Sequence, residues 1–530
     1  MLNTSRAHRG MVTSPHHLAS EAGARVLREG GNAIEATVAM AAALAVVYPH
    51  MTSIGGDGFW IINVPNSTNP ISIEACGGAA HAASPALYAA RGLMEIPWRG
   101  PLAANTVAGT LSGWSNALEL SAELGGRVPL SRLTEDAVWH AEHGFAVTAS
   151  QAELTQLKCA ELRDTPGFSA TFLIDGGPPR EGALMKFPAM GRTLRRLGES
   201  GLDDFYRGDL AREIAADLER LGSPVGQQDL AQHSARRRAC LSVGVRGATL
   251  YNFAPPTQGL ASLMILALFE RLGVTEPESF AHIHGLVEAT KQAFLVRDLV
   301  VGDPDVMTMT AEQFLDDSRL DRLASRIDRD HALAWPAPAS AGDTVWLGAI
   351  DGSGLAVSFI QSIYFEFGSG CVLPGSGIVW QNRGTTFQLE GTGPRVIAPG
   401  RKPFHTLNPA LARFDDGRVM VYGTMGGDGQ PQTQSAIYSR YGFFGQGLQS
   451  ALTAPRWLLG KTWGESSVTL KLESRFDPAV VSALRAAGHD VEILPAFTST
   501  MGHAGAIVRH PNGLLEGASD PRSDGAAIGF

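Results

Sequence analysis

The sequence predicts a layered α+β protein in which a helix-rich first half precedes a β-rich second half. Segments with helical spacing dominate the first 330 residues, and short alternating strands dominate after residue 343. Between them lies DRDHALAWPAPASAGD, residues 328–343, which has neither periodicity and is the best linker candidate. Because strands and helices come in runs and do not alternate, a parallel βαβ repeat is not expected.

The first half is assigned from helix caps and hydrophobic spacing. Residues 20–29 have helical spacing and stop at Gly30-Gly31, where glycine can adopt the left-handed conformation that ends a helix. Asn32 is a suitable N-cap for an Ala-rich helix over residues 33–47, whose few polar positions predict burial on most sides. Further helices are predicted over residues 131–143, 208–221, 258–272, 279–297 and 311–326, and strands over residues 59–64 and 241–252.

The second half is assigned mainly from alternating strands separated by turn residues. The predicted elements are strands over residues 344–351, 355–364 and 377–381, a hairpin turn at 415–417, and helices over 432–441 and 478–487.

Composition excludes several classes of protein. The chain has 530 residues, 44% of them hydrophobic, so it can bury a large core and is neither disordered nor fibrous. Its formal charge of −9 and scattered basic residues argue against a nucleic-acid partner. No signal-type segment opens the sequence and no apolar run reaches the roughly 20 residues that span a bilayer, so a cytoplasmic protein without a membrane partner is expected. The four cysteines form no zinc or disulfide pattern, and no cluster suggests a metal or organic cofactor.

Thr344 follows the linker and begins a predicted strand. Taken alone, a threonine there is an ordinary β-branched strand residue. If the chain is cut after Asp343, Thr344 gains a free α-amine, with a pKa of about 7.7 to 8.0, that can accept the proton of its own hydroxyl. One residue would then supply both nucleophile and base.

Gly426-Gly427 lies between a predicted strand at 418–422 and a helix. Successive glycines let backbone N–H groups point into one concavity, which suits an oxyanion. A tight turn without a catalytic role explains the same pattern. A second glycine-rich segment, Gly55-Gly56-Asp57-Gly58, precedes a strand and does not join a strand to a helix, so it fails the context test for a dinucleotide loop.

Four ordered segments resemble the γ-glutamyltransferase family of N-terminal-nucleophile hydrolases. Residues 10–62 contain that family's Pro-His, Ala-Ser-Glu-Ala-Gly, Gly-Gly-Asn-Ala and Gly-Gly-x-Gly elements, and FGSGCVLPGSGIVWQN, RKPFHTLNPAL and LLEGASDPRSDGAAIGF resemble its later segments. The resemblance implies a four-layer αββα sandwich and self-cleavage into a large chain, residues 1–343, and a small chain, residues 344–530. The two chains would form one globular unit, and a homo-oligomer of such heterodimers is left open.

The resemblance also implies roles for single residues. Thr344 is the expected nucleophile, the bond between Asp343 and Thr344 is the expected cleavage site, and Gly426 and Gly427 are the expected oxyanion donors. Residues 388–400 are expected to form a loop over the site.

The sequence departs from the family where a γ-glutamyl group is recognised. Glu74 lies where true transferases have an arginine for the substrate's α-carboxylate, and Thr386 lies where an acid binds the amino group. A zwitterionic glutamyl donor would therefore leave buried charges unpaired, which is costly. We expect a different acyl group.

Arg383 falls where relatives have an amide side chain that contacts the donor. Its planar guanidinium could hold a small carboxylate, and a surface arginine beside the following loop is the equally weighted alternative. The predicted substrate contacts are Arg383, Asn382, Tyr364, Ser362, His405 and Thr406. The pattern resembles the oxamate amidohydrolase branch, cytoplasmic relatives that split oxamate into oxalate and ammonia in purine-ring nitrogen salvage.

Three functions follow as hypotheses. The first is hydrolysis of a small acidic amide such as oxamate through an acyl-enzyme on Thr344, without a cofactor. The second is a γ-glutamyl hydrolase or transferase, or a cephalosporin-acylase-like enzyme. The third belongs to another class: an uncleaved, inactive homologue that acts as a binding protein.

Overall fold

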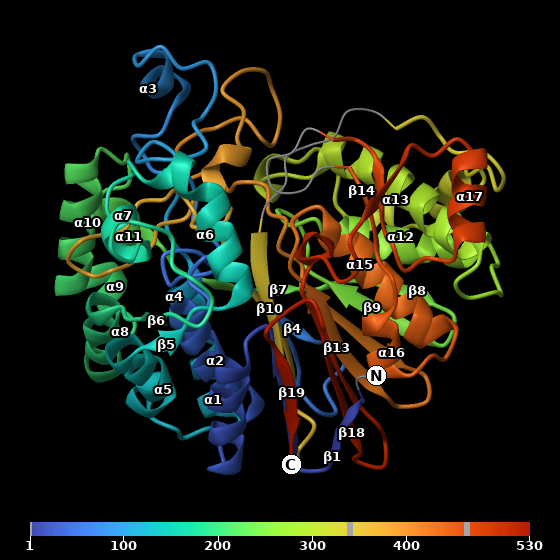
Figure 1. Ribbon diagram of the computed structural model, residues 1–530, viewed down its shortest axis with the longest axis horizontal. Coiled ribbons are helices and arrows are strands. Elements are labelled where there is room, and N and C mark those ends of the chain that lie inside the picture. The colour runs from blue at the N-terminus through green and yellow to red at the C-terminus, as the bar shows by residue number, and fades with distance from the viewer. Residues whose placement is uncertain (1–2, 336–342, 461–466) are drawn as a thin grey trace.

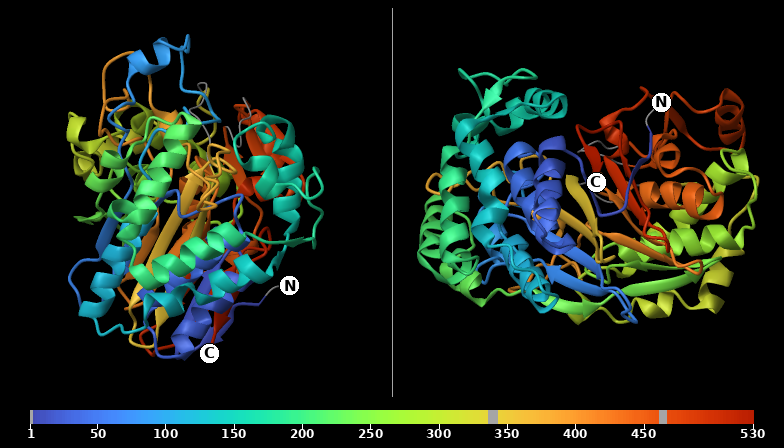
Figure 2. Two further views of the ribbon diagram at one scale, coloured as in Figure 1. Left: turned by 90° about the vertical axis from the view of Figure 1, so that its left-hand side faces the viewer. Right: turned by 90° about the horizontal axis from the view of Figure 1, so that it is seen from below.

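Two seven-stranded antiparallel sheets face each other at the centre of the molecule, and helices cover both outer faces (Figure 1). The structure is a computed structural model that describes residues 3–335, 343–460 and 467–530. The right-hand view of Figure 2 shows the sheets between the two helical layers. The expected four-layer αββα sandwich is therefore confirmed.

The sheet that carries Thr344 has β10 and β11 near its middle. Its strands, in spatial order, are β19 (Ala526–Gly529), β2 (Gly10–Ser14), β10 (Asp343–Asp351), β11 (Ala356–Tyr364), β3 (Asp57–Asn63), β4 (Ile71–Ala75) and β7 (Arg236–Ala239). The central position surrounds β10 with hydrogen-bonded neighbours on both sides, β2 and β11.

The facing sheet is built mostly from the second half of the chain. Its strands, in spatial order, are β1 (Ser5–Ala7), β18 (Leu515–Ser519), β17 (Ala504–Arg509), β13 (Val419–Thr424), β12 (Ala410–Phe414), β9 (Ala248–Asn252) and β8 (Leu241–Val245). The predicted hairpin at 415–417 joins β12 to β13 and is confirmed. Two smaller sheets are formed by β14 (Trp457–Leu459), β15 (Leu470–Glu473) and β16 (Val491–Leu494), and by β5 (Phe145–Ala146) and β6 (Leu184–Met185).

A hydrophobic layer joins the two sheets. Phe59 and Ile61 of β3 and Trp346 of β10 pack against Leu411 and Val421 of the facing sheet, and all five are buried. Because side chains alternate along a strand, the neighbours of these residues point to the other face and join the helical layer.

Helices from the first half cover the sheet that carries Thr344. They are α1 (His17–Arg28), α2 (Ala33–Val47), α4 (Thr110–Glu123), α5 (Leu130–His143), α6 (Ala149–Leu162), α7 (Phe168–Phe172), α8 (Pro188–Ser200), α9 (Asp204–Arg207), α10 (Asp209–Leu221) and α11 (Gln227–Gln232), with the short α3 (Pro85–Ala89) apart from this layer (Figure 1). The predicted cap of α2 is confirmed, because Asn32 and Glu35 form a reciprocal capping box. Every residue of α2 is buried, as its composition predicts.

Helices of the other layer cover the facing sheet. They are α12 (Gly259–Arg271), α13 (Phe280–Val300), α14 (Asp317–Ala324), α15 (Gly429–Tyr438), α16 (Leu448–Thr453) and α17 (Pro478–Ala486). No helix in the described ranges is long and apolar enough to cross a membrane.

Two predicted elements differ from the structure. Residues 377–381 are not a strand, because Val379 and Trp380 make only isolated bridges and have no continuous partner. The helix predicted over 311–326 is shorter, with a 3₁₀ turn at Glu312–Phe314 and a separate helix, α14. Of the predicted linker, residues 336–342 lie outside the described residues.

Candidate active site

Thr344 lies at the start of β10 and its side chain is fully buried. Its hydroxyl donates a hydrogen bond to Ser362 Oγ of β11 at 3.4 Å and accepts one from Gln430 Nε2 of α15 at 3.3 Å. Residues of one sheet and of a helix that covers the facing sheet therefore meet at this hydroxyl.

The backbone is irregular at the predicted cleavage junction. Asp343 lies opposite Tyr364, but Val345 lies opposite Gln361, so two residues of β11 oppose Thr344 alone. Such bulges are frequent beside active sites. Tyr364 has a φ of 81°, which is unfavourable for a non-glycine residue and marks local backbone strain.

Gly426 and Gly427 form the turn between β13 and α15, with φ values of 115° and 51°. Glycine adopts this left-handed region without the steric cost that a side chain imposes. Their backbone N–H groups donate no hydrogen bond within the described part of the chain. Gln430 links the turn to the candidate nucleophile, because its backbone N–H donates to the Gly427 carbonyl at 3.2 Å and its side chain donates to Thr344.

A buried polar brace holds the glycine turn from behind. Gln258, at the start of α12, donates from Nε2 to the Gly427 carbonyl at 2.7 Å and to the Thr406 carbonyl at 2.8 Å. Its Oε1 accepts a hydrogen bond from Arg297 of α13 at 2.9 Å, and Arg297 forms an ion pair with Asp428 at 3.1 Å. Nothing in the sequence pattern marked this brace, since its members are far apart in the chain.

Arg383 is fully buried, so the surface alternative for this residue is wrong. Its Nη1 donates to Thr406 Oγ1 at 3.1 Å, and its guanidinium lies 4.0 Å from the ring centre of Tyr364. Its Nε and Nη2 have no hydrogen-bond partner in the described chain. Burial lowers the pKa of Arg383 to about 10, so the group stays protonated near neutral pH.

Asp57 and His405 lie beside Arg383 and are also fully buried. Asp57 Oδ1 accepts hydrogen bonds from the backbone N–H groups of Gly77 and Gly109, at 3.3 and 3.0 Å. Asp57 Oδ2 lies 3.5 Å from His405 Nε2, and neither atom has a hydrogen-bond partner among the described residues. Burial raises the pKa of Asp57 to about 7 and lowers that of His405 well below its usual range.

Asp57 was not predicted as a site residue, although its glycine-rich segment drew notice. The sequence pattern excludes a dinucleotide loop in that segment and matches the family's Gly-Gly-x-Gly element, but neither result gives Asp57 a role. A carboxyl group between glycines at the start of a buried strand was the available signal.

The predicted residues Thr344, Ser362, Tyr364 and Arg383 form one connected group. Ser362 Oγ accepts hydrogen bonds from the Thr344 hydroxyl and from the Tyr364 backbone N–H, the latter at 2.8 Å. The Tyr364 ring then stacks on the guanidinium of Arg383. The candidate nucleophile and the buried cation therefore belong to one connected group of side chains.

Asn382 is placed differently from its neighbour. It is buried, but its Oδ1 accepts the Phe365 backbone N–H at 3.1 Å and its Nδ2 donates to the Trp98 carbonyl at 2.9 Å. The amide thus holds two backbone segments together, and its geometry favours a positioning role over contact with a substrate.

Glu74 is neutralised within the protein. It is buried and forms ion pairs with Arg238 and Lys402. The acid that stands where relatives are expected to have a cation is therefore already paired, and it offers no free charge to a substrate.

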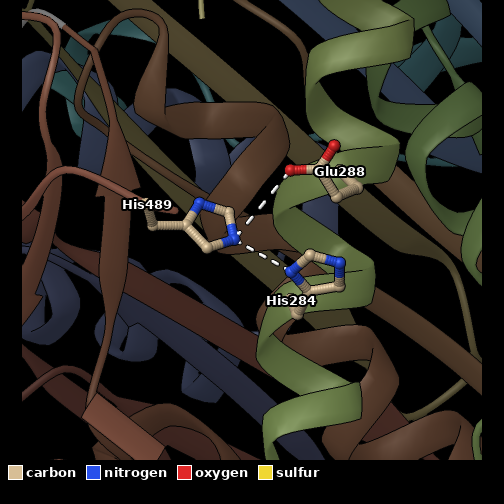
Figure 3. Close-up of side chains that lie close together, drawn as sticks. All are labelled: His284, Glu288 and His489. Atoms are coloured by element: carbon tan, nitrogen blue, oxygen red, sulfur yellow. Dashed lines mark hydrogen bonds and ion pairs between the residues drawn. The ribbon is translucent and has the colours of Figure 1, made fainter. Parts of the chain in front are cut away.

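One buried cluster outside this site has the composition of a metal site. His284 and Glu288 of α13 and His489 point toward one another, with ligand atoms within 4.8 Å (Figure 3). The ring nitrogens His284 Nδ1 and His489 Nε2 lie 2.9 Å apart, and the Lys291 ammonium lies 2.7 Å from Glu288 Oε1. Lys291 already supplies the cation, and together with Glu288 it binds both backbone groups of Leu333. The cluster fits an anchor for the segment before the linker better than a metal site.

Comparison with known proteins gives one consistent match. The gamma-glutamyltranspeptidase family model matches residues 19–530. The chain is 55% identical over 522 residues to the oxamate amidohydrolase proenzyme of Klebsiella pneumoniae, with 98% of each chain covered. It is 39% identical over 525 residues to the glutathione hydrolase-like YwrD proenzyme of Bacillus subtilis, again with 98% of each covered. Among solved structures, the cephalosporin acylase from Bacillus halodurans aligns with a TM-score of 0.92 at 30% identity, covering 100% of this chain and 97% of that chain.

Proposed function

The chain belongs to the gamma-glutamyltranspeptidase family, and we propose that it is a self-processing amidohydrolase that splits oxamate into oxalate and ammonia through an acyl-enzyme on Thr344. The family match and the relatives support an amide-cleaving enzyme. The names of two relatives call them proenzymes, which supports processing of this precursor into two chains. The nucleophile and the substrate are our inference from the family resemblance together with the site.

Processing begins with the Thr344 hydroxyl in this proposal. Its oxygen bonds to the carbonyl carbon of Asp343, the peptide C–N bond breaks, and the nitrogen takes up the hydroxyl proton to become the amine of Thr344, which leaves an ester between the two residues. Water then cleaves the ester and leaves a carboxylate on Asp343 and a free amine on Thr344. The bulge at this junction supports the step, because an irregular backbone is easier to distort for the attack.

Turnover uses the same hydroxyl. The Thr344 oxygen bonds to the amide carbon of oxamate while its proton passes to the α-amine, and the developing oxyanion faces the N–H groups of Gly426 and Gly427. The carbon–nitrogen bond then breaks, and ammonia leaves with the proton from the amine. Water adds to the oxalyl ester, the ester bond breaks, and oxalate leaves as the hydroxyl is restored.

The observation that carries the substrate assignment is the buried, half-satisfied guanidinium of Arg383. A buried cation without full pairing is costly, so its two nitrogens without partners, Nε and Nη2, call for an anionic partner. A carboxylate matches the flat, two-pronged geometry of a guanidinium. Oxamate carries its carboxylate directly on the carbonyl carbon, so one small molecule can contact Arg383 and present its amide to Thr344.

A γ-glutamyl or glutaryl donor is the competing substrate class. A γ-glutamyl donor carries both an ammonium and a carboxylate on a longer chain. Glu74 is not free to bind that ammonium, because it is already paired with two cations. Arg383 is the one cation that we predict for a substrate carboxylate. We therefore place this class second.

Ammonia release from oxamate tests the proposal. The wild type should release ammonia and oxalate in equal amounts, and γ-glutamyl and glutaryl amides assayed beside it should turn over far more slowly. A preference for either longer amide would reject oxamate as the substrate. A single full-length band after long incubation, with no turnover of any amide, would favour the uncleaved binding protein.

A further inference from the structure

Three buried polar groups converge at the recognition end of the site. They are Nε and Nη2 of Arg383, Oδ2 of Asp57 and both ring nitrogens of His405. None of these atoms has a hydrogen-bond partner among the described residues. Buried polar atoms are nearly always paired, so a cluster of unpaired ones needs a reason. One unpaired cation would be explained by an anionic substrate alone. A carboxyl group with an unpaired oxygen beside that cation is not explained in this way.

We propose that the pair formed by Asp57 and His405, called here the proton-holding pair, must carry a proton for Arg383 to bind an anionic substrate. The inference rests on the proposed function in one respect, that Arg383 receives the substrate's carboxylate. Asp57 would then be a further residue of the site, and its protonation state would control when the substrate binds.

The charge balance of the site supports this proposal. With Asp57 ionised, its charge cancels that of Arg383, and an incoming carboxylate would leave one buried negative charge in excess. With a proton on Asp57, the substrate's carboxylate and Arg383 balance each other. A buried net charge is costly, so binding and protonation favour each other.

The geometry offers a place for the proton. Asp57 Oδ1 is already used by two backbone N–H groups, so Oδ2 is the free oxygen. It faces His405 Nε2 at 3.5 Å, and burial keeps His405 neutral, so this nitrogen can accept the proton that Oδ2 carries. The His405 ring is held edge-on against Phe59 at 4.9 Å, which fixes its orientation.

Other titratable groups near Asp57 do not replace it in this role. Burial raises the pKa of Cys76 and of Tyr206 well above neutral, so both stay uncharged. The charge of Lys402 helps to lower the pKa of His405. Burial lowers the pKa of Lys402 itself to about 8, but Lys402 forms an ion pair with Glu74. The pKa of Asp57, raised to about 7, lies in the range where a pH change would alter binding.

Inhibition by oxalate tests the coupling apart from catalysis. Oxalate does not change its charge between pH 6 and 8.5, so a change in its inhibition constant reports on the protein. In the wild type the inhibition constant should rise as pH rises above about 7, approaching tenfold for each pH unit, since one proton is linked to binding. In Asp57→Asn the pH dependence centred near 7 should be lost, and only the change caused by the Thr344 α-amine, whose ordinary pKa is about 7.7 to 8.0, should remain.

A matched control removes a buried carboxylate elsewhere. Asp217→Asn alters an acid of α10 that binds Arg220 and the Gly375 backbone, and it should keep the wild-type pH dependence. A wild-type constant that is flat with pH, or a full pH dependence retained by Asp57→Asn, would overturn the proposal. For variants that turn over no oxamate, binding of oxalate is followed by calorimetry over the same pH range. Absence of oxamate turnover at every pH, with oxalate binding still linked to pH, would reject the proposed substrate alone.

Discussion

The two ends of the candidate site differ in how well their polar atoms are satisfied. At the nucleophile end, Thr344 is hydrogen-bonded to Ser362 and Gln430, and the glycine turn is braced by the ion pair of Arg297 and Asp428. At the recognition end, Arg383, Asp57 and His405 keep unpaired atoms in a fully buried setting. On the proposed function, the fold completes the groups that must be placed before reaction and leaves open those that a substrate would complete. Removing a residue of the brace should therefore mainly lower stability, and removing a residue of the recognition end should mainly lower activity.

The largest effect is expected from Thr344→Ala. Loss of the hydroxyl removes both the self-cleavage step and the acyl-enzyme, so the chain should stay uncleaved and oxamate turnover should fall at least about 10³-fold. Gel electrophoresis and ammonia release measure the two losses. Thr344→Ser keeps a hydroxyl and should be cleaved, more slowly. Cleavage or activity that survives the alanine change would refute the assignment.

Arg297→Met should mainly reduce stability. It leaves Asp428 buried without its cation, and breaking a buried ion pair in this way costs about 3 to 5 kcal/mol. Denaturant unfolding measures the change. The double variant Arg297→Met/Asp428→Leu removes both charges and should recover much of the loss; no recovery would show that the pair is not the cause.

Arg383→Met should mainly reduce activity. The substrate loses a buried charged partner, so kcat/KM for oxamate should fall. The expected fall corresponds to a loss of about 2 to 5 kcal/mol of transition-state stabilisation. At pH 5.5, where Asp57 carries its proton, the free protein loses an incompletely paired cation, so its melting temperature should stay equal or rise. A marked fall in melting temperature with normal kcat/KM would place Arg383 with the structural residues instead.

Asp57→Asn should stabilise the free protein at alkaline pH. The folded-state pKa of about 7 exceeds the ordinary value of 3.8, so stability is lost as pH rises through about 7. The variant lacks this loss, so its melting temperature should exceed that of the wild type at pH 8 and match it more closely at pH 5.5. Equal differences at both pH values would contradict the raised pKa.

Tyr364→Leu should give the smallest effect. It removes the ring that stacks on Arg383, an interaction worth about 0.5 to 2 kcal/mol, and should raise KM for oxamate by roughly two- to thirtyfold. Tyr364→Phe keeps the ring and serves as the control, with a KM near that of the wild type. Equal KM values for the leucine and phenylalanine variants would remove the stacking from the account.

The sequence predicted the features that depend on local chemistry. Asn32 and Glu35 lie three residues apart and form the expected cap of α2, and the hairpin between β12 and β13 follows from its turn residues. The strand predicted at 377–381 failed because alternation alone does not guarantee a neighbouring strand.

The site was only partly predictable for the same reason. The αββα arrangement and the roles of Thr344 and the glycines came from the family resemblance. The burial of Arg383 and the brace through Gln258 depend on segments more than a hundred residues apart, or on packing that no local pattern encodes. Asp57 belongs to this class, because its significance arises only beside Arg383.

The most direct test is the intact mass and N-terminal sequence of purified enzyme that turns over oxamate. The account predicts two chains, residues 1–343 and 344–530, with Thr344 as the first residue of the smaller one. Full activity from a single chain with the bond between Asp343 and Thr344 unbroken would contradict it.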